Sequence, residues 1–210
     1  AGGGMNPPIT AAAALAMFCD PESIFIWKAG PFAIGEHVYA ANGHWVVRLN
    51  PPAGHQYPQA DPEWLPTPKA PGMFTDAAAR PWSDDTVAMA GMALPPAATC
   101  PKCKGTGTIL WVDCDTCGGR GCIECGEAGG WVSDNMGEAL PCFSCDGGVD
   151  DNWKGVNVGC NRFSMKYLRE LKAIPGCTFD PGHDQDVGRF RFPLAEGGEA
   201  VGMLMPRARD

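Results

Sequence analysis

Eight of the eleven cysteines of this chain form four Cys-x-x-Cys pairs between residues 100 and 145. The pairs are Cys100/Cys103, Cys114/Cys117, Cys122/Cys125 and Cys142/Cys145. A Cys-x-x-Cys turn places two thiolates on one side of the backbone, at about the separation of two corners of a tetrahedral zinc site. Because two such turns complete one four-cysteine site, the four pairs predict two structural zinc ions per chain.

The residues that follow each pair strengthen this prediction. Residues 100–107 and 114–121 both read Cys-x-x-Cys-x-Gly-x-Gly, and the third and fourth pairs keep parts of that pattern. Glycine is useful at these positions because a backbone with positive φ can turn its amide N–H groups toward the sulfur atoms.

Over residues 100–149 the pattern resembles the cysteine-rich zinc domain of DnaJ-type chaperones, which has four such repeats and two zinc ions. The resemblance implies a nested pairing of the repeats. One ion would then be held by Cys100, Cys103, Cys142 and Cys145, and the other by Cys114, Cys117, Cys122 and Cys125. The link of residues 118–121 is shorter than is usual in that family, so a sequential pairing stays open. The chain has no His-Pro-Asp motif, so partnership with an ATP-driven chaperone is not implied.

Paired cysteines can also serve two other roles. A disulfide within a Cys-x-x-Cys turn is strained and usually redox-active, and four in succession would be an unusual scaffold. Ligation of an iron–sulfur cluster by eight cysteines in strict pairs is less typical still. Zinc is therefore the favoured interpretation.

Composition bounds the function further. The 210 residues have a formal charge of −8, and two tetrathiolate zinc sites would bring it to about −12. Such a chain has little general attraction for nucleic acid, whose binding depends on Lys and Arg at the phosphates. A local basic patch of Lys102, Lys104 and Arg120 remains in the cysteine-rich region. Because no apolar run reaches the roughly 18 residues of a membrane span and no leader is evident, we expect a soluble cytoplasmic protein that binds no membrane.

The flanks of the cysteine-rich region predict short elements joined by turns, in keeping with 28 glycines and 20 prolines. Helices are expected at residues 11–18 and 164–173, and strands at 23–28, 32–40, 44–49, 84–94, 177–179, 188–194 and 200–205. Asn42-Gly43 is a strong signal for a hairpin turn between two of these strands. Residues 50–71 carry seven prolines and are expected to be an irregular connection.

The two flanks share the order helix, strand, hairpin, which indicates an internal duplication. Residues 40–49 (AANGHWVVRL) and 201–207 (VGMLMPR) resemble, more weakly, motifs of one domain of the bacterial DNA sliding clamp. We therefore expect an α+β fold in which a clamp-like duplicated domain, residues 5–96 and 151–210, is interrupted by a zinc-binding module at 97–150. The combination of resemblances is typical of phage-encoded proteins.

Catalysis has little support in the sequence. His37, His44, His55 and His183 are scattered, and no nucleophile or phosphate-binding motif is present. A loop with Asp180, His183, Asp184 and Asp186 could bind a metal, but a solvated loop is the simpler interpretation. The remaining cysteines, Cys19, Cys160 and Cys177, are expected to be small buried residues rather than nucleophiles. The chain is accordingly predicted not to be an enzyme.

The sequence is compatible with two functions. The first is a zinc-stabilised protein-binding or chaperone-like module that contacts its partner through apolar groups of the cysteine-rich region. These groups are Ile109, Leu110, Trp111, Trp131, Val132 and Phe143. The second is a clamp-related accessory factor that binds nucleic acid by stacking. The acidic charge favours the first, although Trp111 and Trp131 could equally serve only to pack the module.

Overall fold

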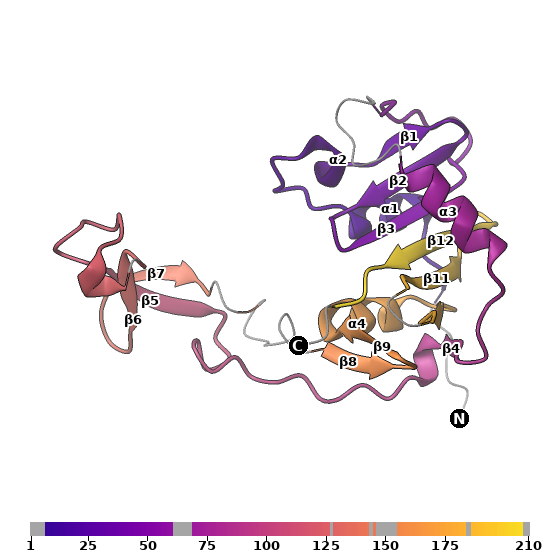
Figure 1. Ribbon diagram of the computed structural model, residues 1–210. Helices are drawn as coiled ribbons and strands as arrows, with labels where there is room; N and C mark the ends of the chain where they lie inside the picture. The colour runs from indigo at the N-terminus through magenta and orange to yellow at the C-terminus, as the bar shows by residue number, and fades with distance from the viewer. Residues whose placement is uncertain are drawn as a thin grey trace. The chain divides into compact units, whose positions relative to one another are not determined.

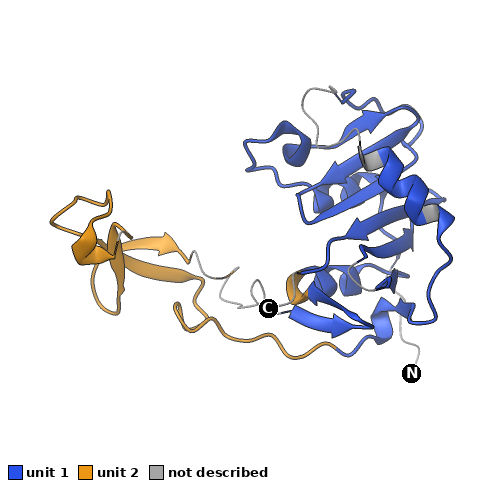
Figure 2. Cartoon of the chain, in the orientation of Figure 1, with its two compact units in different colours: residues 1–93, 155–163, 167–210 blue, residues 94–154, 164–166 orange. Residues whose placement is uncertain are grey.

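Figure 1 shows the computed structural model of the chain, which describes residues 7–60, 69–126, 128–142, 145, 155–183 and 186–207. The chain divides into two compact units (Figure 2). Unit 1 comprises Ala1–Ala93, Gly155–Phe163 and Tyr167–Asp210, and unit 2 comprises Leu94–Lys154 and Ser164–Lys166. The fold is α+β with antiparallel sheets, as predicted. None of the helices in the described part of the chain is long and apolar enough to cross a membrane.

Unit 1 is built on a seven-stranded antiparallel sheet. Its strand order is β1 (Phe32–Ile34), β2 (His37–Ala41), β3 (Trp45–Leu49), β12 (Glu199–Leu204), β11 (Gly188–Pro193), β10 (Thr178–Asp180) and β4 (Val87–Ala88). The Asn42-Gly43 turn joins β2 to β3, and Gly43 adopts the positive φ of 94° that this turn requires. The hairpin of β11 and β12 and the short strand before it also confirm the prediction.

Two aromatic layers cover the sheet. On one face, Phe18 at the end of α1 (Ala11–Phe18) stacks on Phe190 and Phe192 and contacts the tilted ring of Trp45. The helix α4 (Met165–Ala173) lies on that same face, where Tyr167 contacts Trp45 at 4.8 Å between ring centroids. On the other face, Phe74 of α3 (Lys69–Ala79) meets Tyr39 edge-on. Alternate residues of β2, β3 and β12 thus serve two separate apolar layers, whereas β11 gives Phe190 and Phe192 to the first layer and places Arg189 and Arg191 on the other face.

Before the cysteine-rich region, the observed helices and strands differ from the predicted ones in four places. Residues 23–28 are not a strand, because the chain folds back there, with the Asp20 amide donating to the Lys28 carbonyl, and forms the short helix α2 (Ile26–Ala29). Residues 32–40 form two strands rather than one, since Gly35 turns the chain with a φ of 60°. The expected irregular stretch contains the start of α3, because Pro71 sits in the first turn, where its missing N–H costs nothing. The expected strand at 84–94 is only β4, followed by a 3-10 turn at Met89–Gly91. Residues 61–68 lie outside the described part.

A further hairpin precedes α4 and was not predicted. It pairs β8 (Gly155–Val158) with β9 (Asn161–Ser164). In β8 two valines alternate with Gly155 and Asn157, but over only four residues, and β9 (Asn-Arg-Phe-Ser) has no such alternation, so the strand signal of this hairpin is weak.

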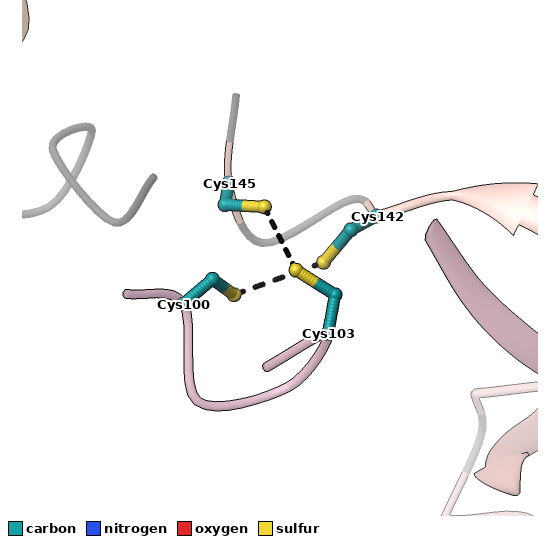
Figure 3. A group of neighbouring side chains, drawn as sticks. All are labelled: Cys100, Cys103, Cys142 and Cys145. Atoms are coloured by element: carbon teal, nitrogen blue, oxygen red, sulfur yellow. Dashed lines mark hydrogen bonds between the residues drawn. The ribbon is translucent and has the colours of Figure 1, made fainter. Parts of the chain in front are cut away.

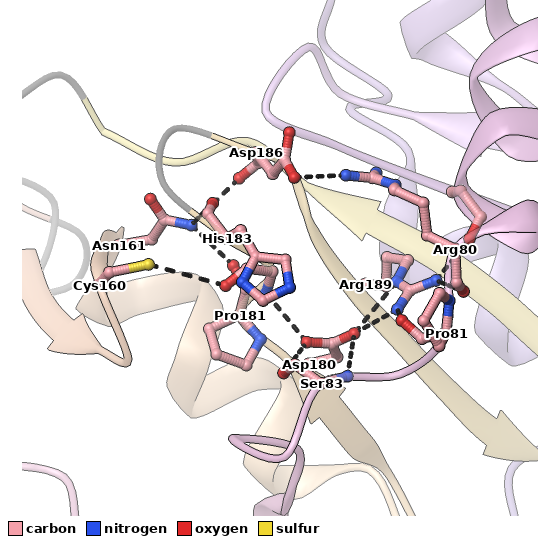
Figure 4. Close-up of polar contacts among 12 residues, drawn as sticks. Arg80, Pro81, Ser83, Cys160, Asn161, Asp180, Pro181, His183, Asp186 and Arg189 are labelled. Atoms are coloured by element: carbon pink, nitrogen blue, oxygen red, sulfur yellow. Dashed lines mark hydrogen bonds and ion pairs between the residues drawn. The ribbon is translucent and has the colours of Figure 1, made fainter.

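A buried ion pair links strands β10 and β11 of the sheet to the end of α3 and the segment after it (Figure 4). Asp180 is fully buried and Arg189 is 5% exposed, and their side chains form a salt bridge between β10 and β11. The Arg189 guanidinium also donates to the carbonyls of Ala77, Arg80 and Pro81, while Ser83 donates to Asp180 through both its amide and its hydroxyl. Burial raises the pKa of Asp180, but the hydrogen bonds from Ser83, Arg189 and the Gly182 amide outweigh it and lower the pKa.

Unit 2 contains a three-stranded antiparallel sheet with the order β6 (Gly130–Ser133), β5 (Thr108–Asp113), β7 (Glu138–Pro141). A single 3-10 turn, Ile123–Cys125, precedes β6 in the described part of this unit. The central strand β5 pairs with both neighbours, and this pairing positions the cysteines described next.

Candidate metal centres

The first cysteine group lies at the start of β5. The turn with Cys100 and Cys103 precedes this strand, and Cys142 follows β7, its pairing partner. The register ends with Thr108 opposite Pro141, and the Cys142 amide donates to the Gly107 carbonyl at 2.8 Å. Sheet pairing therefore brings together two cysteine pairs that are far apart in the sequence. Cys145 completes the group, and the four side chains point toward a common centre (Figure 3).

The second group lies at the other end of the same strand. Cys114 follows β5, and its amide donates to the carbonyl of Gly129, which precedes β6. The 3-10 turn presents Cys122 and Cys125 to Cys114 and Cys117. The six residues of β5 thus separate the two groups by roughly 20 Å of strand.

Sulfur–sulfur distances test whether each group fits a metal. Across the first group, Cys100 and Cys142 lie 3.9 Å apart and Cys103 and Cys145 lie 3.5 Å apart. In the second, the sulfur atoms lie 3.7 Å apart from Cys114 to Cys122, 3.9 Å from Cys117 to Cys125 and 3.8 Å from Cys122 to Cys125. A tetrahedron of sulfurs around zinc, with bonds of about 2.3 Å, has edges of about 3.8 Å. Both groups therefore match tetrahedral ligation, and all eleven cysteines are free of disulfides.

Backbone amides support the sulfur atoms, as the glycine pattern predicted. Gly121, with a φ of 90°, directs its amide to the Cys117 sulfur at 3.2 Å, and the Cys122 amide reaches the Cys125 sulfur at 3.3 Å. This Cys122 amide, together with other donors, lowers the pKa of Cys125 to about 7. Burial raises the pKa of Cys103, but amides of Gly107 and Gly105 and neighbouring thiols outweigh it and lower the pKa to about 6.

One thiol of the second group departs from this trend. Burial raises the pKa of Cys117 to about 11, even though the Gly121 amide opposes the shift. A bound divalent cation would reverse that direction, because a metal keeps its thiolate ligands deprotonated.

The two groups differ in their surroundings. In the first, Cys100, Cys103 and Cys142 are buried and pack with Ile109. Trp111 and Leu140 add partly buried apolar contacts to that cluster. In the second group, Cys114 and Cys117 are buried, whereas Cys122 and Cys125 are half-buried and Ile123 between them is 94% exposed. The second centre is thus the more accessible of the two.

The grouping is the nested one that the resemblance implies. In the part of the chain that the structure describes, no other set of three or more Cys, His, Asp or Glu side chains converges closely enough to hold a metal. The loop that carries Asp180, His183, Asp184 and Asp186 agrees only in part with the prediction that it is solvated, since His183 is exposed but Asp180 is buried. Asp180 is neither a ligand nor solvated but belongs to the buried ion pair, and Asp186 pairs with Arg80 at 2.5 Å. Asp184 lies outside the described residues.

The structure confirms that Cys177 is buried, as predicted, and corrects several other single-residue predictions. Cys177 is buried, and burial raises its pKa to about 12, while Cys19 is half-buried with a pKa raised by burial to about 11. Cys160, in contrast, is exposed, because it lies in the β8–β9 turn, where its thiol donates to the Gly182 carbonyl. Ile109, expected to contact a partner, is 3% exposed because it faces the first cysteine group.

The predicted basic patch is also engaged within the molecule. Lys104 forms a 2.8 Å salt bridge with Asp134, and Arg120 donates to the Cys117 carbonyl. Phe143 lies outside the described residues, whereas Trp131 and Val132 are 49% and 38% exposed.

Comparisons with protein-family models, with curated proteins and with solved structures found no match to this chain. The assignment of function therefore rests on the geometry of the chain's own residues.

Proposed function

We propose that this chain is a non-enzymatic, zinc-stabilised binding protein whose unit 2 contacts a protein partner. The observation that carries the proposal is the pair of four-cysteine groups with sulfur separations of 3.5–3.9 Å. Four thiolates around each ion leave no open coordination position, so the metal has a structural rather than a catalytic role. Thiolate ligands persist in a reducing compartment, which supports a cytoplasmic location.

Zinc is the favoured metal because tetrahedral four-thiolate sites are typical of it. Native mass spectrometry of the full chain is expected to show two zinc ions. The same spectrum reports whether the chain is a monomer. A chain with fewer than two ions, or with iron in their place, would contradict the proposed centres.

The DnaJ-like pattern of the cysteine region supports a role in protein binding, and the exposed apolar side chains of unit 2 are consistent with it. Reduced and carbamidomethylated lysozyme, an unfolded basic protein, is a suitable probe for the full chain. We expect it to bind the zinc-loaded chain and to lose binding after chelation. Zinc-independent binding would show that unit 2 is not the contacting surface.

A second candidate is an accessory factor with a clamp-like duplicated domain that binds nucleic acid. It is favoured by the arrangement of unit 1, where two three-stranded antiparallel meanders meet at the β3–β12 pair and α1 and α4 lie on the same face. Binding of a labelled single-stranded oligonucleotide that falls steeply between 50 and 200 mM salt would support this candidate. We prefer the first because α1 has no charged residue and the chain is acidic overall.

A further inference from the structure

The sheet of unit 2 has two unlike faces. The register places Ile109, Trp111 and Leu140 on one face, where they pack against the first cysteine group. The other face contains residues that alternate with these along the strands. They are Thr108, Leu110, Val112, Trp131, Ser133, Ala139 and Pro141. We call this second set the open face.

No residue of the open face is buried. Leu110 and Val112 on the central strand are half-buried, Trp131 is 49% exposed and Ala139 is exposed. Met136, in the turn between β6 and β7, is 63% exposed and adds another apolar side chain beside the sheet. A sheet normally buries an apolar face against a second layer, and an apolar face left bare marks an interaction surface.

Charge limits the choice of occupant. Residues 94–154 carry nine Asp and Glu against four Lys and Arg, and each tetrathiolate zinc centre would contribute about −2 more. A second copy of this acidic unit and a nucleic acid would both be repelled. A partner segment with basic residues beside an apolar stripe would be attracted by the acidic unit, and its apolar stripe would bury Trp131.

We propose that the open face is a docking surface for a basic, amphipathic segment of a partner protein, anchored on Trp131. Tryptophan is the residue type most often found at the energetic centre of an interface, because it buries a large rigid surface. This inference rests on the proposed function of unit 2 and specifies the surface and the chemistry of the partner.

Two variants of adjacent residues separate the open face from the opposite one. Trp131→Thr removes the anchor, and Val132→Thr makes a matched change on the same strand, facing the other way. Threonine keeps the β preference at both positions. The probe is a fluorescent peptide of alternating leucine and lysine, titrated against the full zinc-loaded chain by anisotropy. We expect at least tenfold weaker binding for Trp131→Thr and less than threefold for Val132→Thr.

Control peptides test the chemistry. A peptide of alternating leucine and glutamate is expected to bind at least tenfold more weakly, and so is one of alternating serine and lysine. If the serine–lysine peptide bound as tightly as the leucine–lysine peptide, charge alone would explain the binding, and the proposal would be overturned. Equal effects of the two threonine variants would also overturn it.

A third variant guards against misfolding of Trp131→Thr. If that variant holds fewer than two zinc ions, Ala139→Arg tests the same face by adding bulk and charge at an exposed position. Its control, Asn135→Arg, adds the same charge in the exposed turn. At least tenfold weaker binding for Ala139→Arg alone supports the open face, and equal loss in both variants overturns it.

Two outcomes identify another occupant. A dimer that dissociates in Trp131→Thr would assign the face to a second copy, and a single-stranded oligonucleotide that displaces the peptide would assign it to nucleic acid; either result overturns the basic partner. If the unfolded lysozyme probe still binds in a zinc-dependent way while no peptide does, the proposed function stands and the open face is wrong.

Discussion

The two units bury different kinds of group. Unit 1 buries large apolar side chains on both faces of a seven-stranded sheet, including Phe18, Phe74, Phe179 and Phe190. In the part of unit 2 formed by residues 94–154, Ile109 is the only buried hydrophobic side chain that is not a cysteine among the residues that the structure describes. Burying one isoleucine contributes about 1.5–3 kcal/mol, whereas ordering each residue of backbone costs about 1–2 kcal/mol. Unit 1 can fold on apolar burial, but unit 2 needs another source of free energy.

Metal removal gives the largest expected difference between the units. Structural zinc supplies on the order of 10 kcal/mol per site, so chelation should unfold unit 2 while unit 1 stays folded. Hydrogen exchange read by mass spectrometry should show loss of protection in β5, β6 and β7 and retention in β3, β11 and β12. Protection that persisted in unit 2 without metal would contradict the role assigned to the two cysteine groups.

Cysteine variants sharpen the same comparison. Cys100→Ser and Cys114→Ser are each expected to lower the metal content by one ion, since they lie in different groups. Cys160→Ser is the matched control, because Cys160 is exposed and belongs to neither group. It should keep both ions and full protection in unit 2. Loss of a metal ion in this control would show that the ligand sets are wrongly assigned.

The next prediction concerns the buried ion pair of unit 1. Arg189→Gln leaves Asp180 charged and without its partner, which is expected to cost about 3–5 kcal/mol of the free energy of unfolding. Arg191→Gln, two residues along the same strand, affects an exposed pair with Glu199 at 3.8 Å and should cost less than about 1 kcal/mol. Urea unfolding followed by tryptophan fluorescence measures both. Similar costs would mean that Arg189 contributes no more than a surface charge.

The cysteine groups and the buried ion pair differ in whether the sequence alone predicts them. The cysteine groups were predictable because ligand type and spacing are local and chemically specific. Helices α1 and α4, the Asn42-Gly43 turn and the β11–β12 hairpin also followed from local signals. The Arg189–Asp180 pair did not. Alternation in Gly188–Pro193 places Arg189 on the same face as the exposed Arg191, so the sequence predicts that Arg189 is exposed too. Arg189 is buried because the segment after α3 covers it.

The other misses have similar tertiary causes. Residues 23–28 have the composition of a strand, but no strand in the described part of the chain pairs with them, and the chain turns back on itself instead. Proline-rich composition concealed α3, whose Phe74 is held by contact with Tyr39. Local propensity decides such segments only where no tertiary contact competes.

A further prediction concerns the dependence of the stability of unit 1 on pH. Because the folded-state pKa of Asp180 is lowered, its contribution to stability is fully present above the unfolded value of about 3.9 and is lost as pH falls through the folded pKa. Unit 1 should therefore lose stability in this acid range, and Asp180→Asn should lessen the dependence. Urea unfolding of unit 1 at pH 7 and at pH 3 provides the test. An unchanged pH dependence in Asp180→Asn would assign the acid sensitivity to other carboxylates.

The smallest expected effect is at the start of α1. The Thr10 hydroxyl accepts a hydrogen bond from the Ala13 amide at 3.2 Å, and the Glu196 carboxylate accepts one from the Ala11 amide at 3.1 Å. Thr10→Ala should cost about 1 kcal/mol of the free energy of unfolding, and Thr10→Ser, which keeps the hydroxyl, much less. Urea unfolding measures both, with metal content as the internal comparison. Because the cap lies in unit 1, the zinc content of unit 2 should stay at two ions in both variants, and a fall in zinc would show that the two units do not fold independently.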